Sequence, residues 1–346
     1  MSDRPSETRT AIDPTPGILD AGSIRVATID IGSNSLRLMV ADVRPDGSYE
    51  LVDDEKVVTR LCRGTSRSDA LEPEAIDETA AAVRTMKRIA EGLGVERMRA
   101  VATCAVREAA NREVFLHRVR ELAELEVEVI SGDAEAMYAH ASVEAAFDLA
   151  GTDVAVVDIG GGSTEILLSS DGIVSQVASM SIGAVRLTEA VAATIRDRRL
   201  ERLERLVREH LKAHLGRPRL VPSVMIGTGG TFTAIGAMQR LRHEDAAADA
   251  DRARVNLRGE RLHRADVRRL LEQLNRMSDR ERQSVPGLNP DRADIILAGI
   301  TIADTVMDRL GVNQLLIHDG GVRDGVLLEM AEQIVPGAGG DRRGLN

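Results

Sequence analysis

Aromatic side chains are scarce in this sequence, which has two Tyr, three Phe and no Trp among 346 residues. Proteins that bind single-stranded nucleic acid stack the bases on aromatic rings, so the shortage of rings argues against that class. The formal net charge of -10 argues the same way, because nucleic acids and anionic membranes select basic surfaces. We therefore expect neither a nucleic-acid partner nor a membrane partner.

Cysteine, lysine and long apolar runs are also rare. Cys62 and Cys104 lie far apart and form no metal-spaced cluster, which favours two reduced, buried thiols in a cytoplasmic protein. No run approaches the roughly 18 apolar residues of a membrane span, and residues 1–22 lack the apolar segment of a signal peptide. Nearly every cation is Arg, so abundance alone says nothing about phosphate binding and each Arg is judged by its position.

The length predicts two compact lobes, because 346 residues exceed the roughly 100–200 of a typical domain. We expect a disordered extension over 1–22, a first domain over 23–131, a second domain over 132–320 and a disordered tail over 336–346. A C-terminal helix at about 321–335 is expected to pack back on the first domain. A homodimer is as compatible with the sequence as a monomer.

Strand and helix patterns alternate along the chain, which indicates an α/β protein. Pro73 opens a helical stretch with apolar residues three and four apart, a strand is expected over 98–106, and helices follow around 108–121 and 134–147. An Ala/Asp-rich loop is expected over 243–252.

Two segments, 26–40 and 154–168, align without a gap, as VATIDIGSNSLRLMV and VAVVDIGGGSTEILL. Strand-turn-strand sequences can resemble each other by chance, but the shared Asp-Ile-Gly favours a duplicated β-hairpin. Two facing hairpins would place two anion-binding turns on opposite walls of one cleft.

Four glycine-rich turns follow apolar strands, at 32–35, 160–164, 227–231 and 320–321. Glycine lets successive backbone N–H groups converge on an anion and removes side chains that would block it. One such turn is weak evidence, whereas four favour a phosphate-bearing ligand. The candidate phosphate-binding residues in these turns are Gly32, Ser33, Asn34, Ser35, Gly160, Gly161, Gly162, Ser163, Thr164, Gly229, Gly230 and Thr231.

Two carboxylates precede these turns. Asp30 and Asp158 end their strands just before the glycines, and Glu165, seven residues past Asp158, returns on the other arm of the hairpin. Magnesium takes a few carboxylates together with waters and phosphate oxygens, so we expect Mg²⁺ or another divalent cation at Asp30, Asp158 and Glu165. For Asp30 alone, simple turn formation is an equal alternative.

An ordered set of motifs resembles one known family. The segments ATCAVREAANREVFL, VISGDAEA, VVDIGGGSTEI, GTGGT, SVPGLNPDRADIILAG and DGGVRDGVL are similar to those of the exopolyphosphatase/guanosine pentaphosphate phosphatase family, in a short form without its HD-type domain. The resemblance implies the actin/Hsp70/sugar-kinase fold, an α/β architecture in which two ribonuclease-H-like (actin-like) domains flank a central cleft.

The resemblance also implies roles for individual residues. Glu135 falls on the position that activates the attacking water, and Asp158 and Glu165 fall on the positions associated with the metal. Arg37 and Arg323 match basic positions. The phosphate contacts fall on Ser33, Asn34, Ser35 and Arg107. The segment around His318 departs from the commoner version of its motif.

These observations predict a phosphoanhydride hydrolase that releases orthophosphate from the end of inorganic polyphosphate. The shortage of rings that could stack on guanine favours polyphosphate over pppGpp, although an Arg plane could replace a ring. An ATP-dependent kinase of the same fold and a non-catalytic polyphosphate or alarmone sensor are the alternatives. His210 and His214 have metal spacing but no third ligand in a recognisable motif, which favours two solvated side chains.

Overall fold

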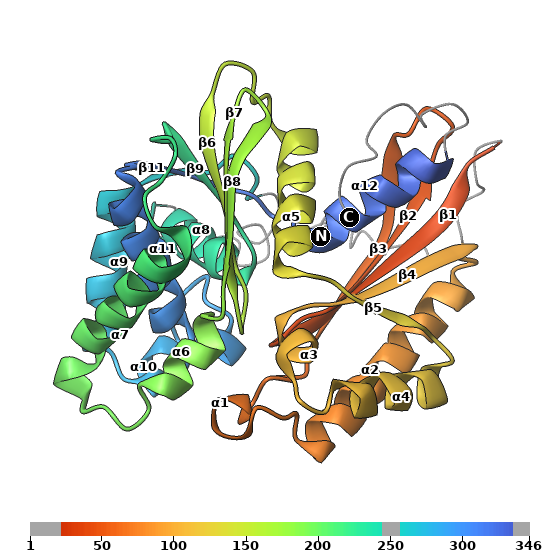
Figure 1. Ribbon diagram of the computed structural model, residues 1–346, viewed down its shortest axis with the longest axis horizontal. Helices are drawn as coiled ribbons and strands as arrows, with labels where there is room; N and C mark the ends of the chain where they lie inside the picture. The colour runs from red at the N-terminus through yellow and green to blue at the C-terminus, as the bar shows by residue number, and fades with distance from the viewer. Residues whose placement is uncertain (1–21, 244–256, 335–346) are drawn as a thin grey trace, which may run out of the picture.

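The computed structural model describes residues 22–243 and 257–334, which form two β-sheets with helices around them (Figure 1). No helix in these ranges is long and apolar enough to cross a bilayer. The strands are β1 (Ile24–Ile31), β2 (Ser35–Val43), β3 (Tyr49–Val58), β4 (Arg97–Ala102), β5 (Val127–Val129), β6 (Asp153–Ile159), β7 (Thr164–Ser170), β8 (Ile173–Met180), β9 (Val224–Thr228), β10 (Arg261–His263) and β11 (Gln314–Ile317).

The helices connect and cover the two sheets. They are α1 (Thr65–Ser68), α2 (Pro73–Gly92), α3 (Cys104–Glu108), α4 (Arg112–Ala123), α5 (Gly132–Ala146), α6 (Ala184–Ala190), α7 (Arg196–His210), α8 (Gly230–His243), α9 (Arg264–Arg276), α10 (Asp279–Arg282), α11 (Ile296–Leu310) and α12 (Val322–Ile334), with a π-helical turn at Leu211–Leu215 and a 3₁₀ turn at Pro290–Arg292.

Both sheets have the same topology. The first has the strand order β3-β2-β1-β4-β5, and the second has β8-β7-β6-β9-β11 with β10 added at its edge. In each, three antiparallel strands in hairpin connection precede strands that run parallel to the first. The hairpins β1–β2 and β6–β7 occupy equivalent places, so the predicted duplication of the β-hairpin is confirmed.

Alternation along β1 determines which way its side chains face. Ala27, Ile29 and Ile31 pack with α2 and α4 on the outer face of the first sheet, whereas Val26 packs with α12 on the inner face. Because successive side chains in a strand point to opposite faces, Asp30 lies on the same inner face as Val26.

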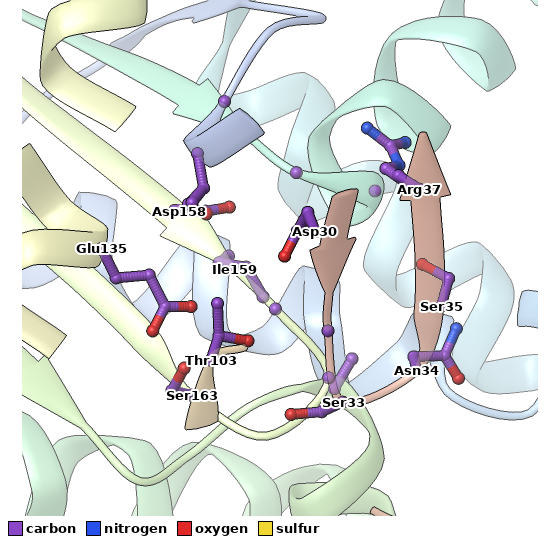
Figure 2. Close-up of a pocket in the computed structure, with 18 of the residues that line it drawn as sticks. Asp30, Ser33, Asn34, Ser35, Arg37, Thr103, Glu135, Asp158, Ile159 and Ser163 are labelled. Atoms are coloured by element: carbon purple, nitrogen blue, oxygen red, sulfur yellow. The ribbon is translucent and has the colours of Figure 1, made fainter. Parts of the chain in front are cut away.

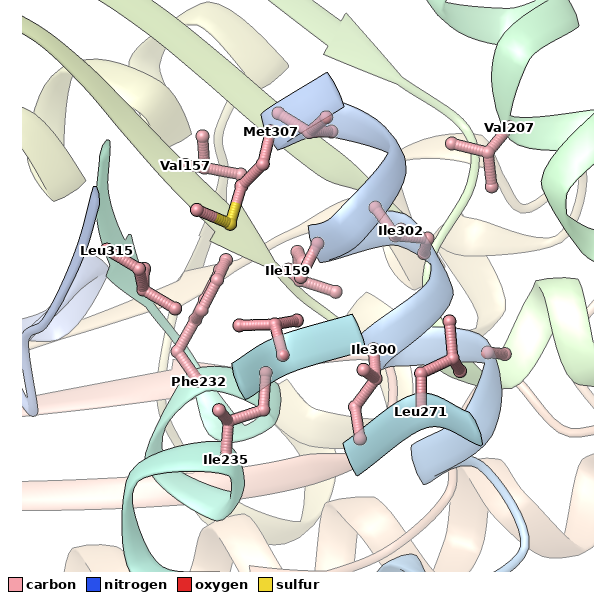
Figure 3. Packing of buried hydrophobic residues seen from close by; sticks show 14 of the residues in the cluster. Val157, Ile159, Val207, Phe232, Ile235, Leu271, Ile300, Ile302, Met307 and Leu315 are labelled. Carbon is pink, nitrogen blue, oxygen red and sulfur yellow. The ribbon is translucent and has the colours of Figure 1, made fainter. Parts of the chain in front are cut away.

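The same alternation operates in β6. Val157 and Ile159 enter the large core of the second sheet, together with Phe232, Ile300 and Met307 (Figure 3). The even-numbered residues of β6 face α5 instead, and Asp158 shares their parity. Two strands with a period of two thereby place their terminal aspartates on the faces that lie toward the other lobe.

Helices α5 and α12 lie between the two sheets (Figure 1). Helix α12 packs on β1 and β2, and α5 packs on β6, β7 and β8. The two helices also cross closely, because a Cβ atom on Gly325 would lie 2.2 Å from the carbonyl oxygen of Tyr138. The Tyr138 hydroxyl donates to Glu329 of α12 at 2.8 Å. The division of the chain into domains at residue 131 stays a prediction.

Some elements differ from expectation. The strand expected over 98–106 ends at Ala102, which pairs with the last residue of β1; with no partner strand beyond it, the chain turns into α3. The helix expected around 108–121 begins only at Arg112. The expected helix at Pro73 is confirmed. Apart from Gly22 and His243, the expected extension, loop and tail lie outside the described residues.

Candidate active site

A cavity of about 100 Å³ opens where the ends of the two sheets meet (Figure 2). Its lining comes from both duplicated hairpins, from the start of α8 and from the turn before α12. The predicted site residues that line it are Asp30, Gly32, Ser33, Asn34, Ser35, Arg37, Glu135, Asp158, Gly160, Gly161, Ser163, Gly229 and Gly230.

The two hairpin turns are built alike and contact each other. In the first turn the N–H of Gly32 donates to the carbonyl of Ser35 at 3.1 Å, and in the second the N–H of Gly160 donates to the carbonyl of Ser163 at 3.0 Å. A Cβ atom on Gly161 would lie 3.0 Å from Cβ of Asn34. The absence of side chains at the glycines therefore lets the two hairpin turns approach within contact distance.

Four carboxyl groups line the cavity, those of Asp30, Glu135, Asp158 and Asp324, and Figure 2 labels the first three. Burial raises the pKa of Asp30 to about 6, with Arg37 opposing and Asp158 adding to the shift. Burial raises the pKa of Asp158 as well. Glu135 is only 5% exposed, and burial raises its pKa to about 8 against the attraction of Arg107. The site holds these groups in a poorly hydrated space, where carboxylates are hard to ionise without a nearby cation.

Arg107 contacts Glu135 and does not line the cavity. One guanidinium nitrogen donates to Oε2 of Glu135 at 2.9 Å and to the carbonyl oxygen of Ile130 at 3.0 Å. Glu135 lies in the first turn of α5, whose N-cap Ser131 accepts from the N–H of Ala134 at 3.1 Å. This contact orients the Glu135 carboxylate, and the expected phosphate contact of Arg107 stays a prediction.

Glu165 pairs with Asp158 across the β6–β7 hairpin, as the seven-residue spacing indicated. It is 1% exposed and lies outside the cavity lining. Its Oε1 accepts from the Ser179 hydroxyl at 2.9 Å. Burial, with Glu135 and Asp158 nearby, raises its pKa well above the usual range.

Three other expected phosphate ligands also lie outside the lining. The hydroxyl of Thr164 donates to the carbonyl of Ile182 at 2.6 Å. Thr231 is buried, and its hydroxyl lies where a side chain on Gly299 would point. Gly162 packs against Ser33, since a Cβ atom on it would lie 2.6 Å from the Ser33 hydroxyl. These residues shape the turns from behind.

The buried carboxylate oxygens suit a divalent cation. Oδ1 of Asp30, Oδ1 of Asp158 and Oε2 of Glu165 are inaccessible and have no hydrogen-bond partner, and such oxygens normally have one. However, within residues 22–243 and 257–334 no three acidic, His or Cys side chains gather into one ligand set. The expected cation at Asp30, Asp158 and Glu165 therefore stays a prediction, and these side chains do not form a preassembled set of three ligands. One or two carboxylates with waters and substrate oxygens fit this geometry, as magnesium prefers.

Sequence reasoning missed several lining residues, among them Thr103, Arg292 and Asp324. The guanidinium of Arg292 lies so close over Gly230 that a Cβ atom there would be 1.9 Å from a nitrogen. Burial and the neighbouring Arg37 lower the pKa of Arg292 to about 10. Arg292 lies within a recognised motif, but the motif alone gave no sign that its side chain reaches the glycine-rich turn at Gly230.

The turn before α12 is held by two acids. The N–H of Gly321 donates to Asp324 at 2.9 Å. Arg323 also lines the cavity, but Asp54 of β3 accepts hydrogen bonds from both its terminal nitrogens, one of them at 2.6 Å. Arg323 thus ties α12 to the first sheet, while Arg37 and Arg292 present positive charge to the cavity.

The model of the Ppx/GppA phosphatase family matches residues 39–334. The chain belongs to the Ppx/GppA phosphatase family. Exopolyphosphatase 2 of Mycobacterium tuberculosis is 33% identical over 328 residues, which cover 89% of this chain and 98% of that protein.

Solved structures of Ppx/GppA relatives have the same fold. A family member from Aquifex aeolicus superposes with a TM-score of 0.73 at 30% identity and covers 90% of this chain and 98% of its own. An exopolyphosphatase from Cytophaga hutchinsonii gives a TM-score of 0.80 at 25% identity, with 90% and 99% covered. The expected two-domain actin-like fold and the expected Ppx/GppA-type phosphatase activity are confirmed.

Proposed function

We propose that this Ppx/GppA phosphatase hydrolyses the terminal phosphoanhydride bond of inorganic polyphosphate in the cytoplasm and releases orthophosphate. The observation that carries the proposal is the lining of the cavity. Glycine turns from both lobes meet there beside Arg37 and Arg292, and the described lining residues include no aromatic ring. A site of this kind recognises phosphoryl groups by backbone and guanidinium donors and offers no ring on which a nucleobase would stack.

Glu135 is the group that accepts a proton. Water attacks the terminal phosphorus in line with the bridging oxygen, its proton passes to the Glu135 carboxylate, and the bond from phosphorus to the bridging oxygen breaks with its electron pair on the shortened chain. A pKa near 8 places Glu135 close to neutral pH, where a general base works best. Arg107 holds the carboxylate toward the cavity.

Asp158 and Asp30 are the carboxylates that would hold a magnesium or other divalent ion, because both line the cavity and each has an unpartnered oxygen. When bound, the cation supplies positive charge to the phosphoryl oxygens as charge shifts during transfer. Arg37 and Arg292 also line the cavity and add fixed positive charge. Because phosphoryl transfer depends on positioning and electrostatics, no covalent nucleophile is required.

The test is phosphate release from polyphosphate by Glu135→Gln and by a matched control, Asp133→Asn. Both residues lie in the first turn of α5, but Asp133 is exposed and Glu135 buried. Loss of a general base lowers kcat by about 10²–10⁴-fold, whereas a surface change is expected to stay within about twofold. Equal activity of the two variants would remove Glu135 from the reaction.

The substrate is tested separately by offering polyphosphate, pppGpp and ATP in parallel. We expect the highest kcat/KM for polyphosphate of short or intermediate length. A higher kcat/KM for pppGpp than for polyphosphate of every length would transfer the assignment to the nucleotide, with Arg37 or Arg292 serving as the stacking plane.

A further inference from the structure

A second cavity, of about 180 Å³, lies within the second lobe among α7, α9, α10 and α11. None of its lining residues belongs to the catalytic cavity. Three arginines line it, and Asp279 is the only acid that the described residues contribute to the lining. The lining residues are Arg196, Arg199, Asn275, Met277, Ser278, Asp279, Arg282 and Leu297.

Arg282 is the buried member of the cluster, with 3% of its surface exposed. Its Nε donates to the carbonyl of Leu274 at 2.9 Å, and one terminal nitrogen pairs with Asp279 at 2.7 Å. Burial lowers the pKa of Arg282, and Arg199 and Arg196 lower it further despite the opposing Asp279. Asp279 in the lining and Glu281, which attracts Arg196 from outside the lining, are two acids against three guanidinium groups, so net positive charge remains.

The side chain of Arg199 contains the hydrogen-bond donor that indicates a ligand. Its Nε is inaccessible to solvent and has no hydrogen-bond partner among the described residues, and a buried donor of this kind normally has an acceptor. Arg196 and Arg282 also serve the C-terminal end of α9, because Arg196 donates to the carbonyl of Arg276 at 2.8 Å. Such capping accounts for two of the three arginines, but it gives no acceptor to Arg199.

We propose that this arginine cavity is a binding site for a phosphate dianion, either free orthophosphate or the terminal phosphate of a chain. Guanidinium groups bind phosphate oxygens by charge-assisted hydrogen bonds. Since a water occupies about 30 Å³ in the liquid, the cavity has room for a phosphate group and a few waters. An anion there would give Arg199 its acceptor and offset the repulsion among the three arginines.

The arginine cavity and the catalytic cavity are both lined by residues of one short segment of the chain. Arg282 and Leu297 line the arginine cavity, and between them in the chain Arg292 and Ile295 line the catalytic one. Within that segment, Asp294 pairs with Arg60 of the first lobe at 3.1 Å. A displacement of residues 282–297 would therefore change the lining of both cavities.

The experiment is an equilibrium titration of the full chain with orthophosphate. We expect two sites per chain in the wild type and in Arg205→Gln, a matched control on α7 whose side chain is 60% exposed. In Arg199→Gln one site should weaken by about tenfold or more, as expected for loss of a charge-assisted hydrogen bond, while the catalytic site persists as an internal reference. Superimposable isotherms for the two variants would refute the proposal.

A variant with the opposite expected effect on affinity separates loss of the site from loss of folding. Asp279→Asn removes the acid from the lining and should bind orthophosphate about threefold more tightly at this site, which a misfolded protein would not do; unchanged affinity would count against the proposal. A titration of tripolyphosphate into Glu135→Gln, which should not hydrolyse it, distinguishes the two sources of phosphate. If adding Arg199→Gln weakens the binding of tripolyphosphate, the ligand is the end of a chain. If only orthophosphate binds at this site, the ligand is the free ion.

Discussion

The carboxyl group of Glu135 makes the stability of the protein depend on pH in the presence of a chelator. Its pKa is about 8 in the folded protein, against 4.5 for an ordinary glutamate. The folded state therefore holds this proton more tightly than the unfolded chain. A raised pKa of an acid contributes stability that is complete below about pH 4.5 and is lost as the pH rises through about 8. The amide of the Glu135→Gln variant does not titrate, so the stability of this variant should lack this dependence on pH.

The magnitude follows from the size of the shift. Each pH unit between the two pKa values changes the free energy of unfolding by about 1.4 kcal/mol, so wild type should lose on the order of 2 kcal/mol relative to Glu135→Gln between pH 6.5 and pH 8. Other groups titrate nearby, because burial lowers the pKa of His318 to about 4 and that of Lys56 to about 7. His318 and Lys56 are present in both proteins and cancel in the difference. Glu165 does not cancel completely, because Glu135 helps to raise its pKa.

The measurement is thermal or urea unfolding of both proteins in EDTA at pH 6.5, 7, 7.5 and 8. For a chain of this size a loss of about 2 kcal/mol corresponds to a relative shift of several degrees in Tm. Magnesium should shrink the difference, because a nearby cation favours the ionised carboxylate. A difference between the two proteins that stays constant from pH 6.5 to pH 8 would show that Glu135 is not held protonated by burial.

Three further changes have defined outcomes. Asp158→Asn should raise the Mg²⁺ concentration for half-maximal activity by about tenfold or more, read from a cation titration; an unchanged titration would exclude Asp158 as a ligand. In Gly183→Ala the new Cβ would lie 2.5 Å from the carbonyl carbon of Gly161, so unfolding should cost about 1–3 kcal/mol less, and a wild-type Tm would contradict that clash. Arg292→Gln should raise KM for polyphosphate by about tenfold, with an unchanged KM counting against a phosphate contact.

Much of the fold was predictable because its determinants are local. The period of two in β1 and β6 decides which side chains enter each core, and Asp30 and Asp158 face the cleft as a consequence of their parity. The repeated Asp-Ile-Gly turn revealed the duplication. The end of β4 could not be predicted from the local sequence, because it depends on where β1 stops pairing, at Ile31 opposite Ala102.

The catalytic cavity was predictable only where its residues share a motif with a turn. Arg292 reaches Gly230 from a distant part of the chain, a contact that no spacing in the sequence encodes. Glu165 has the expected hairpin partner, but its side chain turns to Ser179, and strand register does not determine side-chain rotamers. The contact of Arg107 with Glu135 likewise depends on how α3 meets α5.

The place of α5 between the lobes has a consequence for timing. Glu135 begins a helix that rests on β6, β7 and β8 of one lobe and crosses α12, which rests on β1 and β2 of the other. A change in the angle between the sheets would therefore move α5 relative to one of these two surfaces. The distance from the Glu135 carboxylate to the attacked phosphorus would then vary with the angle between the lobes. The enzyme would hydrolyse the end of a chain only after both lobes have bound it.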